Sequence, residues 1–186
     1  MWGVAERVFA SLFLVSASFA TPQLAVQSVS QTLVEDSAIG MARGVDRMIG
    51  GIVSYAKWPD GTPRATRTMC VVGTPQLSSS LAPTVAGGPV IAVRRSTPAA
   101  SMGGNCDILF LGRMAVADRQ RLIAWVRAKP VLTITDADPD CGHGAMFCLG
   151  GRASTLGFSV NLDAIARGTV RIDPRVLKIG SDGGAR

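Results

Sequence analysis

The chain is poor in the side chains that most often carry catalysis or bind nucleic acid. It has a single histidine, His143, and aromatic residues make up only 5% of its 186 residues. No GxSxG, Walker, GxGxxG or HExxH pattern occurs, so no complete catalytic or nucleotide-binding motif is present. The lysines and arginines are scattered, without interleaved aromatics on which bases could stack. We therefore expect neither an enzyme nor a nucleic-acid-binding protein, and we expect no cofactor.

Long apolar runs are also scarce. The clearest one, residues 8–19, is shorter than the roughly 20 residues that a membrane-spanning helix needs. A small-x-small site at residues 18–20 follows it, which is typical of a secretory signal peptide. We prefer this interpretation to a buried helix of a cytosolic protein. It predicts cleavage after Ala20 and a periplasmic mature protein, and the lack of a nearby cysteine argues against a lipid anchor.

The charge balance is basic. The formal net charge of +6 is unchanged by cleavage, since Glu6 and Arg7 leave together. Outside the cytoplasm, this charge favours acidic partners, anionic headgroups or cell-wall material. The residues that remain after cleavage suffice for one domain with a full core.

Apolar periodicity predicts alternating helices and strands. Residues 21–35 are polar and indicate a flexible lead-in or a frayed helix start, and residues 180–186 a disordered tail. Between them, residues 36–179 predict a single α/β domain, a three-layer sandwich with a central mixed sheet flanked by helices. We expect helices over residues 37–55, 75–81, 118–128 and 162–167, strands over residues 68–72, 90–93, 106–111, 131–135 and 170–172, an antiparallel pair over residues 147–149 and 156–160, and a helical turn or strand over residues 176–179.

Four cysteines in an exported chain indicate two disulfides, and spacing alone leaves three connectivities open. Locality favours Cys141 with Cys148, because the glycine-rich loop between them folds back easily. That choice leaves Cys70 with Cys106, each at an end of a predicted strand. By lowering the entropy of the unfolded chain, the short bridge should stabilise the fold by about 2.5 kcal/mol and the long one by about 4 kcal/mol.

The same loop allows two other interpretations. Cys141, His143 and Cys148 are metal-ligand types, and Asp138 or Asp140 could complete the set, but the spacing matches no strong zinc pattern. A reduced cysteine beside His143 could instead act as a nucleophile, although no triad scaffold is evident. We favour the simplest interpretation, in which His143 is an exposed loop residue.

Two further patterns suggest ligands only weakly. Asp136, Asp138 and Asp140 alternate as in a calcium loop, but the glycine and the closing glutamate are missing, which favours a solvated turn. Residues 73–75 lie between a predicted strand and a predicted helix, where backbone amides could bind an anion.

Six motifs occur in order along the chain: SYAKWP (54–59), CVVGTP (70–75), CDILFLG (106–112), PVLTI (130–134), GAMFCL (144–149) and FSVNLDAIARGTVRIDPRVLKI (158–179). This series resembles the YfiR-like family of periplasmic proteins, from the first helix to Ile179.

The resemblance implies a function that composition does not show. Members of the family are periplasmic repressors that bind the periplasmic sensor domain of an inner-membrane diguanylate cyclase. Binding holds down cyclic-di-GMP synthesis and biofilm formation, and members often form homodimers. The resemblance also implies that Cys70 pairs with Cys106 and Cys141 with Cys148.

The family comparison points to a small set of binding residues. Where the family often has histidine, this chain has Asp173, which leaves Lys57 and Arg171 as a smaller basic site unless Asp173 pairs with Arg171. A periplasmic protein that binds an anionic small molecule or cell-wall fragment at these cations is the alternative function. Trp58 is either a partner anchor or a cap over the core, and Met146 is expected to be more open.

Two neighbouring predictions concern packing only. Phe147 is expected to lie in the core, and Trp125 to be partly buried on its amphipathic helix.

Overall fold

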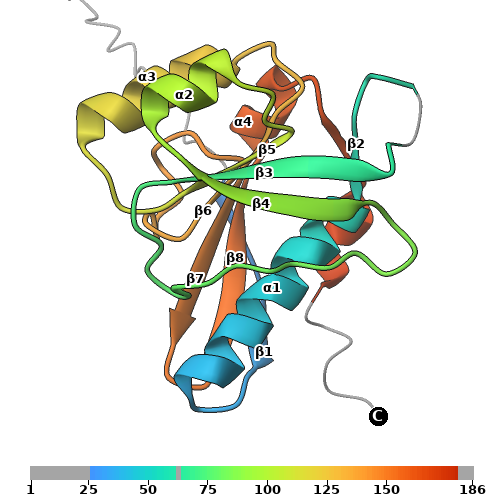
Figure 1. Cartoon of the computed structure of the whole chain (residues 1–186). Helices are drawn as coiled ribbons and strands as arrows, with labels where there is room; N and C mark the ends of the chain where they lie inside the picture. Colours follow the sequence, from blue (N-terminus) through green and yellow to red (C-terminus); the bar gives the residue numbers. More distant parts are fainter. Residues whose placement is uncertain (1–25, 62–63, 180–186) are drawn as a thin grey trace, which may run out of the picture.

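The computed structural model describes residues 26–61 and 64–179, which form one α/β domain (Figure 1). A seven-stranded sheet has the order β1-β8-β7-β6-β5-β3-β4, and a two-stranded ribbon pairs β2 with β9. The strands are β1 (Val26–Leu33), β2 (Ala56–Lys57), β3 (Thr66–Val72), β4 (Val90–Ser96), β5 (Ile108–Leu111), β6 (Leu132–Thr135), β7 (Phe147–Arg152), β8 (Thr155–Asn161) and β9 (Arg171–Ile172). The helices are α1 (Ala38–Ser54), α2 (Pro98–Gly103), α3 (Val116–Val126), α4 (Leu162–Arg167) and the 3₁₀ helix η1 (Pro174–Lys178).

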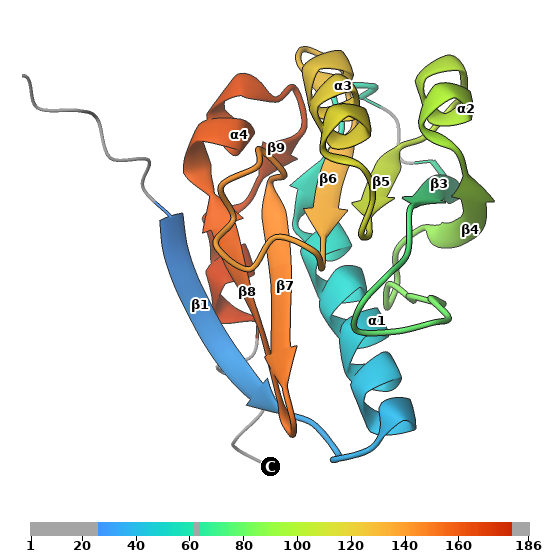
Figure 2. The same ribbon diagram turned by 90° about the vertical axis from the view of Figure 1, so that its left-hand side faces the viewer.

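The main sheet is mixed. Strands β4, β3, β5, β6 and β7 run parallel, whereas β8 pairs antiparallel with both β7 and β1. Helix α1 packs on one face of the sheet, and α2 and α3 lie on the other (Figures 1 and 2). This arrangement confirms the predicted three-layer sandwich.

Helix α1 forms where its apolar stripe predicted it. Ser37 caps its N-terminus, with the side-chain oxygen accepting a hydrogen bond from the Gly40 amide at 2.9 Å. Val45, Ile49 and Ile52 are fully buried against the sheet. The stripe thus fixes which face of the helix meets the core.

Strand β5 lies in the interior of the sheet, between β6 and β3, and is covered on both faces. Ile108 and Phe110 belong to the apolar cluster under α1, and Leu109 and Leu111 to the cluster under α3. All four are fully buried. Burial on both faces explains why this strand has an unbroken apolar sequence.

The predicted lead-in over residues 21–35 is wrong where the structure describes it, because β1 occupies Val26–Leu33. This strand pairs antiparallel with β8, from Val26 opposite Asn161 to Leu33 opposite Thr155. Pairing with β8 makes this segment a strand, although its polar local composition did not predict one. The predicted signal peptide and the predicted tail lie outside the described residues.

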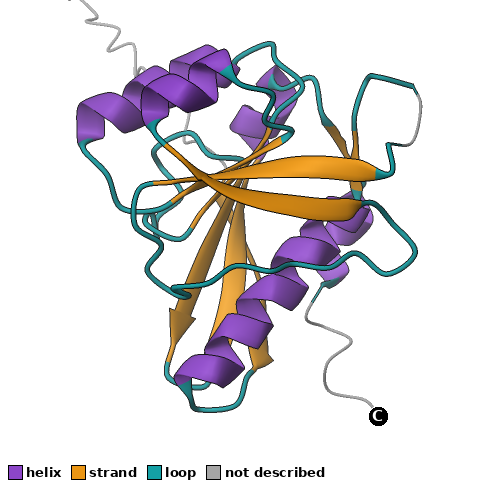
Figure 3. Cartoon of the chain, in the orientation of Figure 1, coloured by secondary structure: helices purple, strands orange, loops and turns teal. Residues whose placement is uncertain are grey.

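The predicted helix over residues 75–81 is also wrong, and this segment is a loop (Figure 3). At its start, Thr74 forms an isolated antiparallel bridge with Arg113, in which each amide donates to the other's carbonyl at 2.9 and 2.7 Å. This bridge commits Thr74 to an extended backbone. The short helix α2, in contrast, was not expected from the sequence.

Candidate functional site

Two disulfides hold the functional region together, as predicted. Cys70 in β3 is bonded to Cys106, just before β5, with a Cα–Cα distance of 5.7 Å. Cys141 is bonded to Cys148 with a Cα–Cα distance of 5.5 Å. The metal site and the thiol nucleophile considered above both need a free thiolate at Cys141 or Cys148, so the second disulfide argues against both.

The loop closed by Cys141–Cys148 is organised around a buried carboxylate. Asp138 is only 1% exposed and accepts hydrogen bonds from the Gly142 and His143 amides at 3.2 and 2.8 Å. The Nδ1 atom of His143 lies 2.8 Å from Asp138 Oδ1, while the imidazole remains exposed. His143 is therefore an exposed loop residue, as expected, but one held by a specific partner.

A second carboxylate, Asp136, fills the place predicted for an external anion. Its Oδ2 atom accepts hydrogen bonds from the Gln76 and Leu77 amides at 2.6 and 2.9 Å. Burial raises the pKa of Asp136 above its usual value, and these hydrogen bonds oppose that rise. The anion beside residues 73–75 is thus the protein's own, and the predicted solvated turn is wrong for Asp136 and Asp138, although Asp140 is exposed.

The ribbon of β2 and β9 brings two candidate binding residues together. Lys57 lies directly opposite Arg171, and both are exposed. Like charges at opposed strand positions repel, so this pair favours an anionic neighbour. Asp173 binds Arg175 at 2.7 Å, rather than Arg171, and this contact lowers the pKa of Asp173 to about 2, with a smaller contribution from Lys57.

Trp58 forms one wall of a cavity of about 490 Å³. The Arg67 guanidinium lies 4.3 Å from the ring centroid, a cation–π geometry. Arg67 is itself buried and pairs with Asp60 and Asp107 at 2.7 and 3.0 Å. Trp58 is half-buried, packs against the apolar core, and has an Nε1 group without a hydrogen-bond partner in the described residues.

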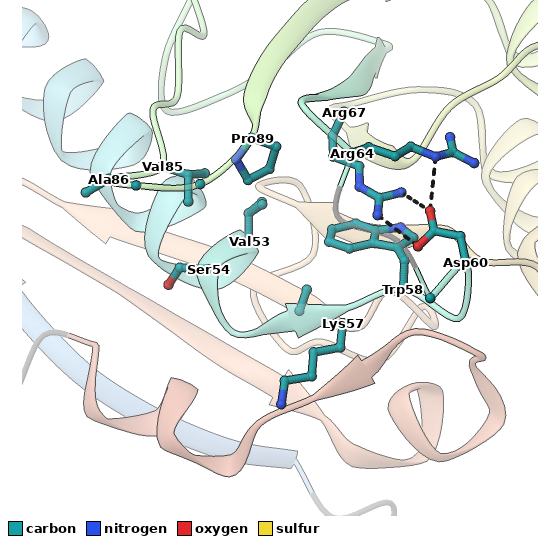
Figure 4. Close-up of a pocket in the computed structure, with 14 residues that line it drawn as sticks. Val53, Ser54, Lys57, Trp58, Asp60, Arg64, Arg67, Val85, Ala86 and Pro89 are labelled. Carbon is teal, nitrogen blue, oxygen red and sulfur yellow. Dashed lines mark hydrogen bonds and ion pairs between the residues drawn. The ribbon is translucent and has the colours of Figure 1, made fainter.

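The cavity is amphipathic. Figure 4 shows apolar side chains on one side and the Asp60, Arg64 and Arg67 ion pairs on the other, with Lys57 extending away from the Trp58 ring. The apolar lining includes Val53, Val85, Ala86 and Pro89. An opening of this size and mixed character suits an inserted side chain of a partner, or a small ligand.

Met146 does not belong to this surface. It is 4% exposed, its amide donates to Thr133 Oγ1 at 2.9 Å, and its side chain lies in the core cluster. The expectation that Met146 is open is wrong, because β7 continues the sheet directly after it. Phe147 is fully buried and Trp125 is partly buried, as predicted.

A second cavity, of about 510 Å³, lies between α3 and the Cys141–Cys148 loop. Sequence reasoning missed it, because its charged side chains come from distant parts of the chain. These are Arg113, Arg119, Arg127, His143, Asp163 and Arg167. We call this cavity the arginine groove.

Comparison with known families decides the assignment. The model of the YfiR/HmsC-like family matches residues 45–181. The chain belongs to this family. The match runs from α1 to the end of η1 and includes both disulfides, the β2–β9 ribbon and the arginine groove.

Membership of the YfiR/HmsC-like family supports a regulatory role in cyclic-di-GMP signalling, in a family of regulators rather than enzymes. The two disulfides and the family both fit a periplasmic protein. Within the described residues, every helix is too short or too polar to cross a membrane.

Proposed function

We propose that this YfiR/HmsC-like protein binds the periplasmic sensor domain of an inner-membrane diguanylate cyclase and lowers its output of cyclic-di-GMP. Family membership supports the signalling role, and the surface around Trp58 supports a protein partner. That surface combines a half-buried tryptophan and an amphipathic cavity that Lys57 also lines, and the exposed Arg171 lies opposite Lys57 on the β2–β9 ribbon. Aromatic side chains and arginines are the commonest energetic centres of protein interfaces.

The observation that carries the proposal is the pairing of Lys57 with Arg171 beside Trp58. The cross-strand pairing holds the two cations side by side, where they can meet an acidic patch. Electrostatic complementarity of this kind raises association rates and fixes the orientation of a partner. Trp58 would then supply the apolar contact, through the part of its ring that faces the cavity.

The test is a pull-down of the oxidised protein with the periplasmic domain of the genomically neighbouring membrane cyclase. Charge reversal at both Lys57 and Arg171 is expected to weaken binding by about tenfold or more, because two attractive contacts become repulsive. Reversal at Arg47 and Arg152 is the matched control, since both are exposed and neither has an ion pair in the described residues. Equal binding by both double variants would rule out this surface.

The basic pair also fits the alternative function, an anionic small molecule or cell-wall fragment bound at Lys57 and Arg171. A thermal-shift screen of the isolated protein separates the two. A ligand whose stabilisation disappears in the charge-reversed variant, together with no capture of any cyclase domain, would favour the alternative.

A further inference from the structure

The arginine groove lies where α/β proteins commonly bind ligands. Its walls are α3, α4, the segment that follows β5, and the Cys141–Cys148 loop that follows β6. Both strands are parallel members of the sheet, so the groove opens at their carboxyl ends. Crevices at this edge of a mostly parallel sheet are the usual ligand sites of such folds. The groove is distinct from the Trp58 cavity, with which it shares no lining residue.

The groove is strongly basic. Four arginines and one aspartate line it, which gives a formal charge of +3 with His143 neutral. The aspartate, Asp163, is already paired with Arg167. Arg113 and Arg127 are exposed, and neither makes an ion pair or side-chain hydrogen bond anywhere in the described part of the chain.

Arg119 adds a buried cation to the groove. It is 7% exposed, and its guanidinium donates to Thr135 Oγ1 at 3.1 Å and to the Gly112 carbonyl at 3.0 Å. Both acceptors are neutral, and no described carboxylate lies within ion-pair distance of it. A guanidinium has five N–H donors, so several remain for another acceptor. A buried charge without a contacting counter-ion is costly. The charge of Asp136, which Arg119 influences without an ion-pair contact, offsets part of this cost, and an anion in the groove would supply a direct counter-ion.

We propose that the arginine groove binds a small polyanion carrying two or more phosphoryl or carboxyl groups. Guanidinium groups bind both kinds of oxyanion through paired hydrogen bonds, and several such groups are needed to match the charge of the groove. The apolar side chains of Met114, Val116 and Ile123 also line it and offer contact to the carbon skeleton of such a ligand. The cavity volume lies within the usual range for small-molecule sites.

The test measures binding of pyrophosphate and of citrate to the isolated, oxidised protein by calorimetry at constant ionic strength. These two probes distinguish phosphoryl from carboxyl groups. The double variant Arg113→Gln, Arg127→Gln is expected to weaken binding of the preferred probe about tenfold or more. It should fold, since the Arg113 and Arg127 side chains have no partners in the described part of the chain. Arg47→Gln combined with Arg152→Gln removes the same charge elsewhere and should bind as the wild type does.

Three outcomes would overturn the proposal. The first is that the wild type binds neither probe. The second is that the two double variants lose affinity equally, which would indicate general charge attraction. The third is that only phosphatidylglycerol vesicles bind through Arg113 and Arg127, which would indicate a membrane surface. The assay contains no cyclase domain, so its failure and that of the proposed partner binding remain distinguishable.

Discussion

Gly144 lies so close to Ile123 that a Cβ atom at residue 144 would come within 2.8 Å of Ile123 Cγ2. Gly144 also has a φ of +90°, which favours glycine. This contact joins the disulfide loop to α3, and the two elements form opposite walls of the arginine groove.

Gly144→Ala should therefore lower the free energy of unfolding by about 1–3 kcal/mol, through backbone strain and the clash with Ile123. It should also weaken polyanion binding, because the loop must move away from α3. Gly142→Ala is the control in the same loop, since a Cβ atom there meets nothing within 4 Å. Urea unfolding of both variants checks the prediction, and equal stability would contradict it.

Removal of the two disulfides should have unequal effects. The Cys70–Cys106 bridge spans 36 residues and the Cys141–Cys148 bridge spans 7. Paired alanine substitutions should lower the free energy of unfolding by about 4 kcal/mol for the first bridge and about 2.5 kcal/mol for the second. Denaturant titrations of the two double variants measure this difference. The opposite ranking would show that native-state packing, rather than loop entropy, decides the contribution.

Arg67 should matter far more to stability than Arg64, although both pair with Asp60 and Asp107. The Arg67 side chain is 6% exposed and that of Arg64 is 56% exposed. Arg67→Ala leaves Asp107 without its buried partner and uncovers Trp58, for an expected loss of about 3 kcal/mol. Arg64→Ala should lose less than about 1 kcal/mol.

Chemical unfolding followed by tryptophan fluorescence tests this pair. Arg67→Ala should also shift the emission of the native protein, because the guanidinium lies over the Trp58 ring. A native spectrum identical to that of the wild type would show that Arg67 does not position this ring.

Asp136 should make the protein less stable as pH rises, because burial raises its pKa in the folded state above the usual 3.8. Well below pH 3.8 the carboxyl is protonated in both states and contributes no pH dependence. As pH rises from 3.8 through the raised pKa, the unfolded state loses its proton first, and stability falls. Asp136→Asn should remove this dependence while its side-chain oxygen still accepts from the Gln76 and Leu77 amides.

The measurement is the free energy of unfolding of wild type and Asp136→Asn across pH 3–8. As pH rises, the free energy of unfolding of Asp136→Asn should increase relative to that of the wild type. A constant difference would mean that the pKa of Asp136 is the same in the folded and unfolded states.

The sequence predicted correctly those helices and strands whose structure follows from the pattern of their own residues. The apolar stripe of α1 and the unbroken apolar β5 formed where expected. The antiparallel pair of β7 and β8 also formed, but β7 is longer than predicted: Gly150 and Gly151 pair with Gly157 and Leu156, and the turn falls at residues 153–154. Strand β1 was missed because its partner, β8, is more than 100 residues away. The helix over residues 75–81 was wrong because the carboxylate of Asp136 binds the amides of that segment.

The candidate sites divide in the same way. Lys57 and Trp58 are adjacent in the sequence, and a family motif marks them. Arg113 and Arg127 belong to no such motif, and Arg167 belongs to a different one. Only the packing of α3 and α4 around the disulfide loop brings the three arginines together. Met146 was misjudged because nothing in its sequence shows that the sheet continues immediately beyond it.

Each disulfide joins two cysteines that are consecutive in the order of the chain. The two bridges are therefore neither nested nor crossed. If the chain is oxidised from its N-terminus as each cysteine emerges, Cys70 is followed by its partner Cys106, and Cys141 by its partner Cys148. Sequential pairing of such a chain requires no disulfide isomerisation to reach the final covalent pattern.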